Sequence, residues 1–269
     1  MISFPHCKIN LGLYITAKRQ DGYHDLDTVF YPVPIHDILE FVENQEPSFH
    51  LTGLPIMGVA ADNLCQKAYQ LLKSKHPSLP SVEIHLHKLI PMGAGLGGGS
   101  SDGAFMLRML NEQFNLGLSR DELMEMALQL GSDCPFFIQD KPAHGLGRGE
   151  ILNPIALSLS SWWLALVNPG IHVSTKTAFS EVSPKPASID LASKILEPVE
   201  SWKNWLCNDF EDSVFKIHPE IPTIKDSLYS QGATYASMTG TGSTVYGLFR
   251  TQPTLQLPSN YLVKTVQLK

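Results

Sequence analysis

The stretch from Pro91 to Ala104 reads P-M-G-A-G-L-G-G-G-S-S-D-G-A and predicts a loop that binds an anion. Glycine occupies five of the seven positions from 93 to 99. Because glycine has no Cβ atom, successive backbone N–H groups in such a loop can crowd around a phosphate that side chains would otherwise keep away.

This loop is predicted to open a helix. Ser100, Ser101 and Asp102 are good N-cap residues, and apolar side chains then recur at helical spacing between residues 106 and 114. A phosphate bound here would meet unpaired N–H groups and the positive end of the helix dipole.

The stretch matches two better-known phosphate-binding motifs, the dinucleotide-binding motif and the Walker loop, only poorly. Gly93, Gly95 and Gly98 satisfy G-x-G-x-x-G. However, residues 82–87 before them alternate apolar and polar, as in an antiparallel strand with one polar face, whereas a dinucleotide-binding fold begins with a continuous apolar strand. A Walker loop fails because Gly99 stands where its lysine should be. A flexible linker is disfavoured, since linkers do not normally run from a strand straight into a capped helix.

The composition is that of an ordinary globular protein. Of its 269 residues, 43% are hydrophobic and 17% are charged, which suits a chain with a substantial core rather than a disordered one. With a net charge of −6 and no basic run interleaved with aromatics, a nucleic-acid partner is not expected. No obligatory protein partner is evident.

The compartment is expected to be the cytoplasm. No signal-peptide pattern follows Met1, and the most apolar later stretch, residues 162–167, is too short to span a bilayer, so no membrane association is expected. The four cysteines form no C-x-x-C pair and predict free, mostly buried thiols in a reducing environment. They are Cys7, Cys65, Cys134 and Cys207.

His85 and His87 lie on one face of the predicted strand and suggest a pair of metal ligands. No third ligand is evident nearby, so a solvated or hydrogen-bonded face is favoured over a metal site. The metal ligands of the protein therefore stay unassigned.

Turn and capping signals predict an alternation of strands and helices. Asp21-Gly22 marks a turn between two strands, and a helix follows Asn63. The capping box Ser119-x-x-Glu122 opens another helix, which Gly131 ends.

The chain is predicted to form two domains, residues 1–153 and 154–269, with the boundary near Asn153-Pro154. A strand is expected at 162–168, and strands flank the small-residue turn T-G-T-G at 239–242, which can approach a ligand closely.

Three motifs resemble, in order, those of the GHMP small-molecule kinases. They are Lys8-x-Asn10-Leu11, the loop at 91–101, and Met238-x-Gly240-x-Gly242, and they span almost the whole length of the chain. Within that family, A-K-R-Q-D-G-Y-H-D-L at 17–26, G-S-D-C-P-F-F at 131–137 and G-R-G-E at 147–150 are similar to the kinases that act on cytidine diphosphate methylerythritol.

The resemblance implies an α+β fold of two domains. The N-terminal one would bind ATP and resemble domain 2 of ribosomal protein S5, and the C-terminal one would be a ferredoxin-like α/β sandwich. ATP and Mg²⁺ are the implied cofactors, and Ser101 is the hydroxyl expected to meet Mg²⁺ or a phosphate. The implied ATP-binding residues are Asn63, Lys88, Pro91, Met92, Gly93, Ala94, Gly95, Leu96, Gly97, Gly98, Gly99, Ser100 and Ser101.

Two residues are expected to carry the chemistry. Phosphoryl transfer has a loose transition state, so a kinase mainly positions the reactants and neutralises charge. The substrate hydroxyl must also lose its proton, and the resemblance assigns this step to Asp133, with Lys8 orienting the carboxylate and the hydroxyl. From the residues alone, Asp133 could equally cap a turn before Pro135, and Lys8 could be a surface residue.

The implied substrate is a small molecule that carries cytosine, which requires an aromatic surface and groups that bond the edge of the base. By resemblance Tyr23, Phe30 and Phe179 are aromatic neighbours of the cytosine, although an aromatic residue taken alone is more often part of the core. The implied substrate-binding residues are Asn10, Tyr23, His24, Phe30, Thr175 and Phe179.

Two alternatives remain. A related kinase could act on homoserine or mevalonate, but neither substrate has a base to stack on Tyr23 or Phe179. A nucleotide sensor of the same fold could bind without catalysis, but such a protein would be expected to lose Lys8 or Asp133.

Overall fold

The protein is described here by a computed structural model, which covers residues 1–56 and 62–269. The chain forms two compact units. Unit 1 consists of Met1–Lys8, Ile35–Met92 and Gly97–Lys141. Unit 2 consists of Ile9–Pro34, Gly93–Leu96 and Pro142–Lys269. The boundary expected at residues 153 and 154 stays a prediction.

The sheet of unit 1 has the strand order β1-β4-β6-β5. Its strands are β1 (Ile2–Ser3), β4 (Ile38–Glu43), β5 (Ser48–Gly53) and β6 (Val82–Lys88). The alternation predicted for residues 82–87 is present, because buried and half-buried side chains alternate along β6. β6 is antiparallel to β4, as expected from that pattern, but parallel to β5.

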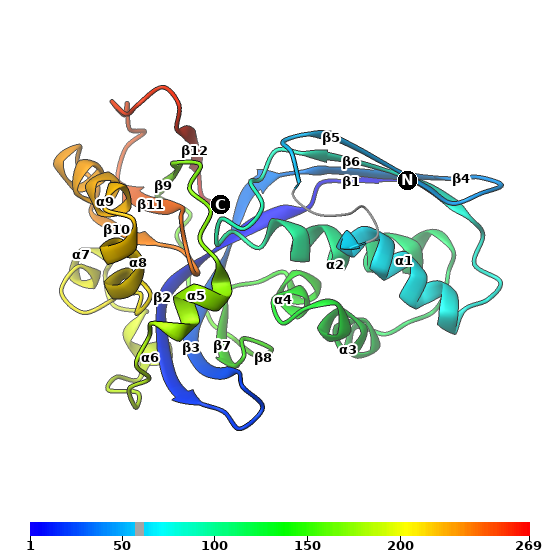
Figure 1. The fold of residues 1–269 in the computed structure, drawn as a ribbon, viewed down its shortest axis with the longest axis horizontal. Helices are drawn as coiled ribbons and strands as arrows, with labels where there is room; N and C mark the ends of the chain where they lie inside the picture. The colour runs from blue at the N-terminus through cyan, green and yellow to red at the C-terminus, as the bar shows by residue number, and fades with distance from the viewer. Residues whose placement is uncertain (57–61) are drawn as a thin grey trace. The chain divides into compact units, whose positions relative to one another are not determined.

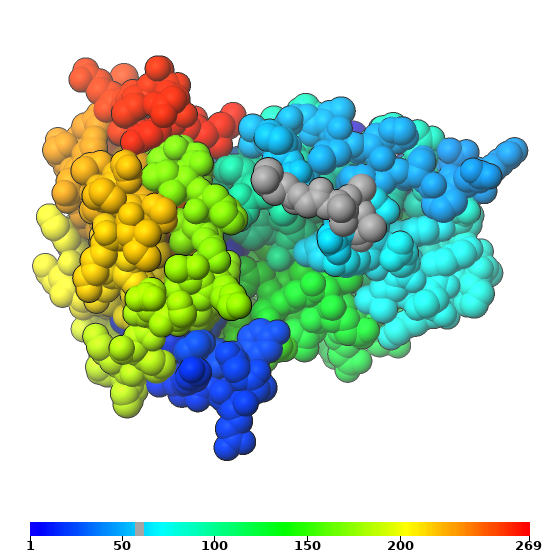
Figure 2. All heavy atoms as spheres, viewed as in Figure 1, coloured from blue at the N-terminus to red at the C-terminus, as the bar shows by residue number. Residues whose placement is uncertain are grey.

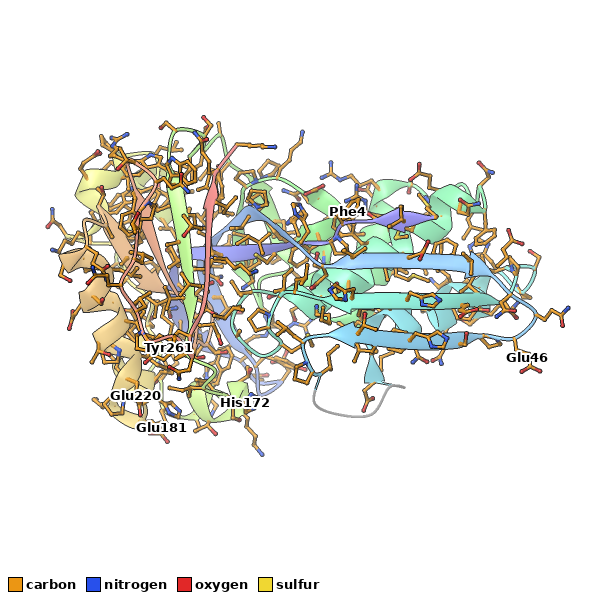
Figure 3. All side chains as sticks on the ribbon, turned by 90° about the horizontal axis from the view of Figure 1, so that it is seen from above. Phe4, Glu46, His172, Glu181, Glu220 and Tyr261 are labelled. Carbon is orange, nitrogen blue, oxygen red and sulfur yellow. The ribbon has the colours of Figure 1, made fainter. Side chains whose placement is uncertain are left out.

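The helices described in unit 1 lie on one side of this sheet, and no helix of the described residues covers the other face (Figures 1 and 3). They are α1 (Leu64–Lys75), α2 (Gly98–Gln113), α3 (Arg120–Leu130) and α4 (Cys134–Gln139), with α3 and α4 packed on α2. The helix predicted after Asn63 is α1, and the predicted capping box opens α3, which ends at Gly131.

The N-cap predicted for α2 is wrong. The helix begins at Gly98, its N-cap is Gly97 in a left-handed conformation, and no side chain caps it. Ser100, Ser101 and Asp102 therefore lie inside the first turns. Asp102 is not available as a cap because its carboxylate binds the ammonium group of Lys88.

A long hairpin dominates the second sheet, whose strand order is β2-β3-β7-β8. Its strands are β2 (His6–Lys18), β3 (His24–His36), β7 (Ala143–Gly147) and β8 (Ile151–Pro154). The predicted turn at Asp21-Gly22 joins β2 to β3, and its tip projects from unit 2 (Figure 2). Gly22 has a φ of +86°, which explains the need for glycine there.

The third sheet is antiparallel, with the strand order β10-β11-β9-β12. Its strands are β9 (Trp163–Asn168), β10 (Tyr235–Met238), β11 (Val245–Phe249) and β12 (Leu262–Gln267). The expected strands near 162–168 and on both sides of residues 239–242 are therefore present.

The helices of unit 2 are mostly short. They are α5 (Thr175–Ser180), α6 (Leu191–Lys194), α7 (Val199–Trp202), α8 (Glu211–Ile217) and α9 (Glu220–Ser230). Ile221, Ile224 and Leu228 recur at helical spacing on α9 and pack into the core with Ala236 and Val245 of the third sheet. No local sequence pattern had predicted these helices.

The helices of the described residues are all too short or too polar to cross a membrane. The four cysteines are free thiols, and Cys7, Cys65 and Cys134 are buried, as predicted, whereas Cys207 is exposed.

Candidate active site

The backbone of the glycine-rich loop requires glycine at alternate positions. Gly93, Gly95 and Gly97 have φ values of +63°, +77° and +68°, in the left-handed region that other residues rarely adopt. The helix that starts at Gly98 leaves its first N–H groups without intrahelical acceptors. In the described structure this part of the loop therefore has the backbone expected of an anion-binding helix N-terminus.

Lys8 and Asp133 meet beside this helix start. The Lys8 ammonium lies 3.5 Å from Oδ2 of Asp133. A Cβ atom added to Gly97 would lie 3.2 Å from the Lys8 side chain and 3.0 Å from the ring of Phe137, so the backbone at Gly97 passes close to the lysine. Unit 1 thus brings together both residues that were predicted to be catalytic and the start of α2.

The simpler roles considered for these two residues do not fit. Lys8 is only 3% exposed and is not a surface residue. Asp133 precedes α4, but its side chain makes no capping hydrogen bond and is about one-third exposed. A carboxylate that is accessible and oriented by a buried ammonium group has the arrangement of a general base.

A buried ion-pair group lies beside the first turn of α2. The Lys88 ammonium, whose residue is 1% exposed, binds Asp37 and lies 2.6 Å from Oδ2 of Asp102. Oδ1 of Asp37 accepts from the N–H groups of Leu89 and Ile90, at 2.6 and 2.9 Å. This ion-pair group was not predicted from the sequence, in which its only signal is a lone carboxylate, Asp37, amid apolar residues.

Asp102 is less well satisfied than Asp37. Its Oδ1 is buried and has no hydrogen-bond partner among the described residues. Burial raises the pKa of Asp102 to about 8, against the attraction of Lys88 and with the help of repulsion from Asp37. Burial lowers the pKa of Lys88, but the two carboxylates raise it by more, so the ammonium stays charged.

Stability is expected to fall as the pH rises toward 8 because of Asp102. A carboxyl group whose folded pKa is raised holds its proton more tightly in the folded state, so its stabilising effect is complete below the unfolded pKa of 3.8 and is lost as the pH passes about 8. Urea unfolding at pH 6 and pH 8.5 should show this loss, and Asp102→Asn should reduce it. An equal loss in that variant would contradict the assignment to Asp102.

Three other residues predicted to contact ATP differ in their surroundings. The side chain of Asn63 caps α1 by accepting from the N–H group of Cys65 at 2.9 Å. Oγ of Ser101 is buried and has no hydrogen-bond partner among the described residues. Lys88 uses its ammonium group in the ion pairs above, so a contact of that group with adenine stays an untested prediction.

In unit 2 the small-residue turn at 239–242 packs against the glycine-rich loop. Thr239 donates its hydroxyl hydrogen bond to the carbonyl of Gly95 at 3.1 Å, and its Oγ accepts from the N–H group of Asn10 at 3.0 Å. The amide of Asn10 also donates to Thr28 at 3.0 Å. Asn208, which the sequence analysis missed, donates to the carbonyls of Met238 and Gly240, both at 2.8 Å.

Replacing Gly95 by alanine is expected to weaken nucleotide binding at least tenfold. A Cβ atom there would lie 1.9 Å from the carbonyl oxygen of Thr239, which is backbone and cannot rotate away. Gly22→Ala is the matched control, since Gly22 has a φ of +86° but open space around it. Titration with an ATP analogue measures the affinity of both variants. If Gly22→Ala weakened nucleotide binding as much as Gly95→Ala, the loss would come from alanine at a positive φ and not from the clash with Thr239.

His24 and Phe179 form a stacked pair in unit 2. Their ring centroids lie 5.0 Å apart with 23° between the planes, and Phe179 packs edge-on against Phe210 at 4.8 Å. Burial, followed by the charge of Lys18, lowers the pKa of His24. At neutral pH the imidazole is therefore uncharged, with one nitrogen as donor and the other as acceptor.

The other predicted substrate residues differ in their surroundings. Tyr23 is 54% exposed, and the guanidinium of Arg148, from the G-R-G-E motif at 147–150, lies 4.9 Å from its ring centroid. Thr175 is exposed at the start of α5. Phe30 is buried in β3, so close to Gly145 that a Cβ atom there would lie 2.5 Å from the ring, and it therefore has the position of a core residue.

Family models and related proteins match both the N-terminal and the C-terminal half of the chain. The model of the GHMP kinases N terminal domain matches residues 63–141, and that of the GHMP kinases C terminal domain matches 192–257. A relative from Azobacteroides pseudotrichonymphae genomovar. CFP2, called 4-diphosphocytidyl-2-C-methyl-D-erythritol kinase, is 52% identical over 93% of this chain and 94% of its own. The chain belongs to the GHMP kinase family.

Solved structures agree with this membership. The crystal structure of a 4-(cytidine 5'-diphospho)-2C-methyl-D-erythritol kinase matches this GHMP kinase with a TM-score of 0.76 and 31% identity, over 92% of this chain and 90% of that one. A mevalonate kinase structure matches with a TM-score of 0.71 over 100% and 99% of the two chains, but at 14% identity this shows the fold alone. The predicted family, α+β fold and ATP-dependent kinase class are confirmed, and the residue roles stay predictions.

Proposed function

We propose that this GHMP kinase transfers the γ-phosphoryl group of ATP to the 2-hydroxyl of 4-diphosphocytidyl-2-C-methyl-D-erythritol. The products are the 2-phosphate and ADP, and the reaction belongs to the non-mevalonate pathway to isoprenoid precursors. Relatives that carry this enzyme's name support the proposal. The observation that carries its chemistry is the Lys8–Asp133 pair beside the start of α2.

In this proposal Asp133 removes the proton of the hydroxyl. The buried Lys8 holds the carboxylate in position and offsets negative charge on the transferred group. General-base help of this kind contributes about 10²- to 10⁴-fold to the rate. In a loose transition state the proton leaves late, so the lower end of that range is expected.

The triphosphate is proposed to bind at the glycine-rich loop and the start of α2. There the N–H groups that lack intrahelical acceptors donate to phosphate oxygens. Mg²⁺ prefers oxygen ligands, and the buried Oγ of Ser101, which has no hydrogen-bond partner among the described residues, is a fitting ligand for it. When bound, the ion would neutralise charge on the phosphates.

The cytosine is proposed to bind at His24, Phe179 and Tyr23. The uncharged His24 can donate to and accept from the edge of the base, and Phe179 and Tyr23 supply aromatic faces. Asn10 and Thr175 are proposed to contact the rest of the substrate. Phe30, being buried, would act by shaping the sheet beneath rather than by stacking.

Tyr23→Ala is expected to raise KM for the cytidine substrate by about tenfold or more, since a stacked base is worth about 1–3 kcal/mol. The ring is half exposed and supports no core, so the variant should fold normally. KM for ATP, measured in the same assays, serves as the internal control. If KM for the cytidine substrate did not change, Tyr23 would not belong to the base-binding residues.

One assay tests the proposed function against its alternatives. ADP release is measured with the cytidine diphosphate substrate, mevalonate and homoserine in parallel. Turnover with the first alone supports the proposal, and turnover with only the other two refutes it. ATP binding without turnover of any of the three would favour a nucleotide sensor.

We propose two domains for this enzyme. Residues 1–153 form the ATP-binding domain and residues 154–269 the C-terminal domain. We also propose that it acts in the cytoplasm and needs neither a membrane nor an obligatory protein partner.

A further inference from the structure

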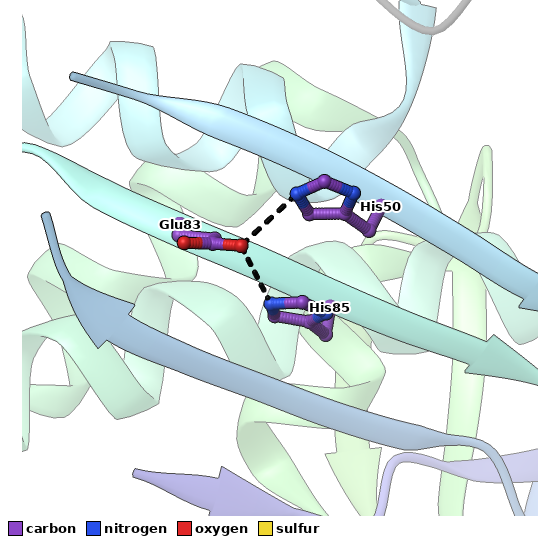
Figure 4. A group of neighbouring side chains, drawn as sticks. All are labelled: His50, Glu83 and His85. Carbon is purple, nitrogen blue, oxygen red and sulfur yellow. Dashed lines mark hydrogen bonds and ion pairs between the residues drawn. The ribbon is translucent and has the colours of Figure 1, made fainter.

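Two histidines and a glutamate meet on the open face of the unit 1 sheet (Figure 4). His50 of β5 stands in register with His85 of β6, and their rings stack at 4.7 Å with 18° between the planes. Glu83 lies two residues before His85 on β6, so its side chain leaves the same face. Its Oε1 is 3.0 Å from Nε2 of His50 and 3.1 Å from Nε2 of His85.

The spacing of these atoms suits a tetrahedral transition-metal ion. Zinc binds imidazole nitrogen and carboxylate oxygen at about 2.0–2.2 Å, which places neighbouring ligand atoms of a tetrahedron about 3.3 Å apart. Both separations from Glu83 lie close to that value, and the three ligand atoms all lie within 4.8 Å of one another. A small rotation of an exposed imidazole ring would adjust the separation of the two histidine nitrogens to this value.

The surroundings of the cluster also favour a site. The side-chain amide of Asn44 donates to the other carboxylate oxygen of Glu83 at 2.9 Å, which orients Oε1 toward the histidines. Both rings are about half exposed, with side-chain values of 52% for His50 and 45% for His85, so an ion can enter from solvent. Figure 3 shows this face of the sheet uncovered by helices.

We propose that His50, Glu83 and His85 form a binding site for Zn²⁺, with water completing the coordination. Two imidazoles and one carboxylate select Zn²⁺ and similar transition-metal ions over Mg²⁺ and Ca²⁺, which prefer oxygen ligands throughout. The site is therefore separate in chemistry from any Mg²⁺ bound with ATP. Because β5 is the outermost strand of the order β1-β4-β6-β5, a bound ion would fasten this edge to β6.

Calorimetric titration of the full chain with Zn²⁺, without nucleotide and in a non-chelating buffer, tests the site. We expect one ion per chain, and at least tenfold weaker binding in His50→Ala and in His85→Ala. His87→Ala is the matched control, since His87 is on the same strand and face but outside the cluster and bonds Thr52 instead. All proteins carry Cys207→Ser, which removes the exposed thiol as a competing ligand.

A second measurement separates coordination from a structural effect of the substitutions. At a Zn²⁺ concentration of about a hundred times Kd, the melting temperature of the parent chain should rise by about 5 °C. Glu83→Gln keeps the shape of the side chain and should lose most of this rise. Zinc affinity that is equal in His50→Ala and His87→Ala, or no binding of Zn²⁺ to the parent chain in the calorimetric titration, would overturn the proposal. The cluster would then be a hydrogen-bonded group only.

Discussion

Asp133→Asn is expected to lower kcat by about 10²-fold or more and to leave the affinity for ATP nearly unchanged. Asparagine keeps the size of the side chain but cannot accept the proton of the substrate hydroxyl. Because Asp133 makes no capping hydrogen bond, the start of α4 should be unaffected. Single-turnover kinetics and titration with an ATP analogue measure the two effects separately.

The control for this variant is Asp226→Asn, the same chemical change at an exposed position on α9. It should have the kcat of the parent enzyme. If Asp133→Asn lost ATP affinity as strongly as kcat, Asp133 would have a structural role. A kcat that fell less than about tenfold would mean that another group or water takes the proton.

Lys88→Met is expected to reduce the free energy of unfolding by about 3–5 kcal/mol. Methionine fills much of the same space, but at pH 8.5, above the pKa of about 8 of Asp102, the buried carboxyl groups of Asp37 and Asp102 would then face each other without a cation. Partial protonation of Asp102, whose pKa is already raised, should make the loss smaller at low pH than at pH 8.5. Denaturant unfolding of the full chain at both pH values measures this.

Lys67→Met provides the comparison for the same change at an ion pair in solvent. Lys67 pairs with Asp62 at 3.0 Å, but both side chains are largely exposed. Exposed pairs are worth about 0–1 kcal/mol, so this variant should be nearly as stable as the parent. Similar losses in the two variants would show that burial of the Lys88 group adds nothing.

Short-range features of the chain were predicted well. The turn at Asp21-Gly22, the cap at Asn63 and the capping box at Ser119 and Glu122 all depend on residues within a few positions of one another. The alternation along β6 likewise follows from the period of a strand. The start of α2 was misplaced because Asp102, a good cap by type, is engaged by Lys88, 14 residues earlier in the chain.

Apart from the pairing of Lys8 with Asp133, which the family resemblance implied, contacts between distant residues were not predicted. Asp37 and Lys88 lie 51 positions apart, and Thr239 and Gly95 lie 144 apart, so no local pattern connects them. The candidate metal ligands also depend on residues that are far apart in the sequence. The sequence offered His85 with His87, but parallel pairing of β5 with β6 places His50 opposite His85 instead. The ligand set could be assigned only once that register was known.

The sequence by itself determined the glycine-rich loop, the helix that follows it and the family, because glycine content and helical spacing act through the backbone over a few residues. Only the tertiary structure decided that Lys8, expected beside Asp133, is buried and that Lys88 is held by two carboxylates. The physical reason is burial. Whether a charged side chain is solvated or paired depends on segments far away in the chain, and that choice sets its pKa and its chemistry.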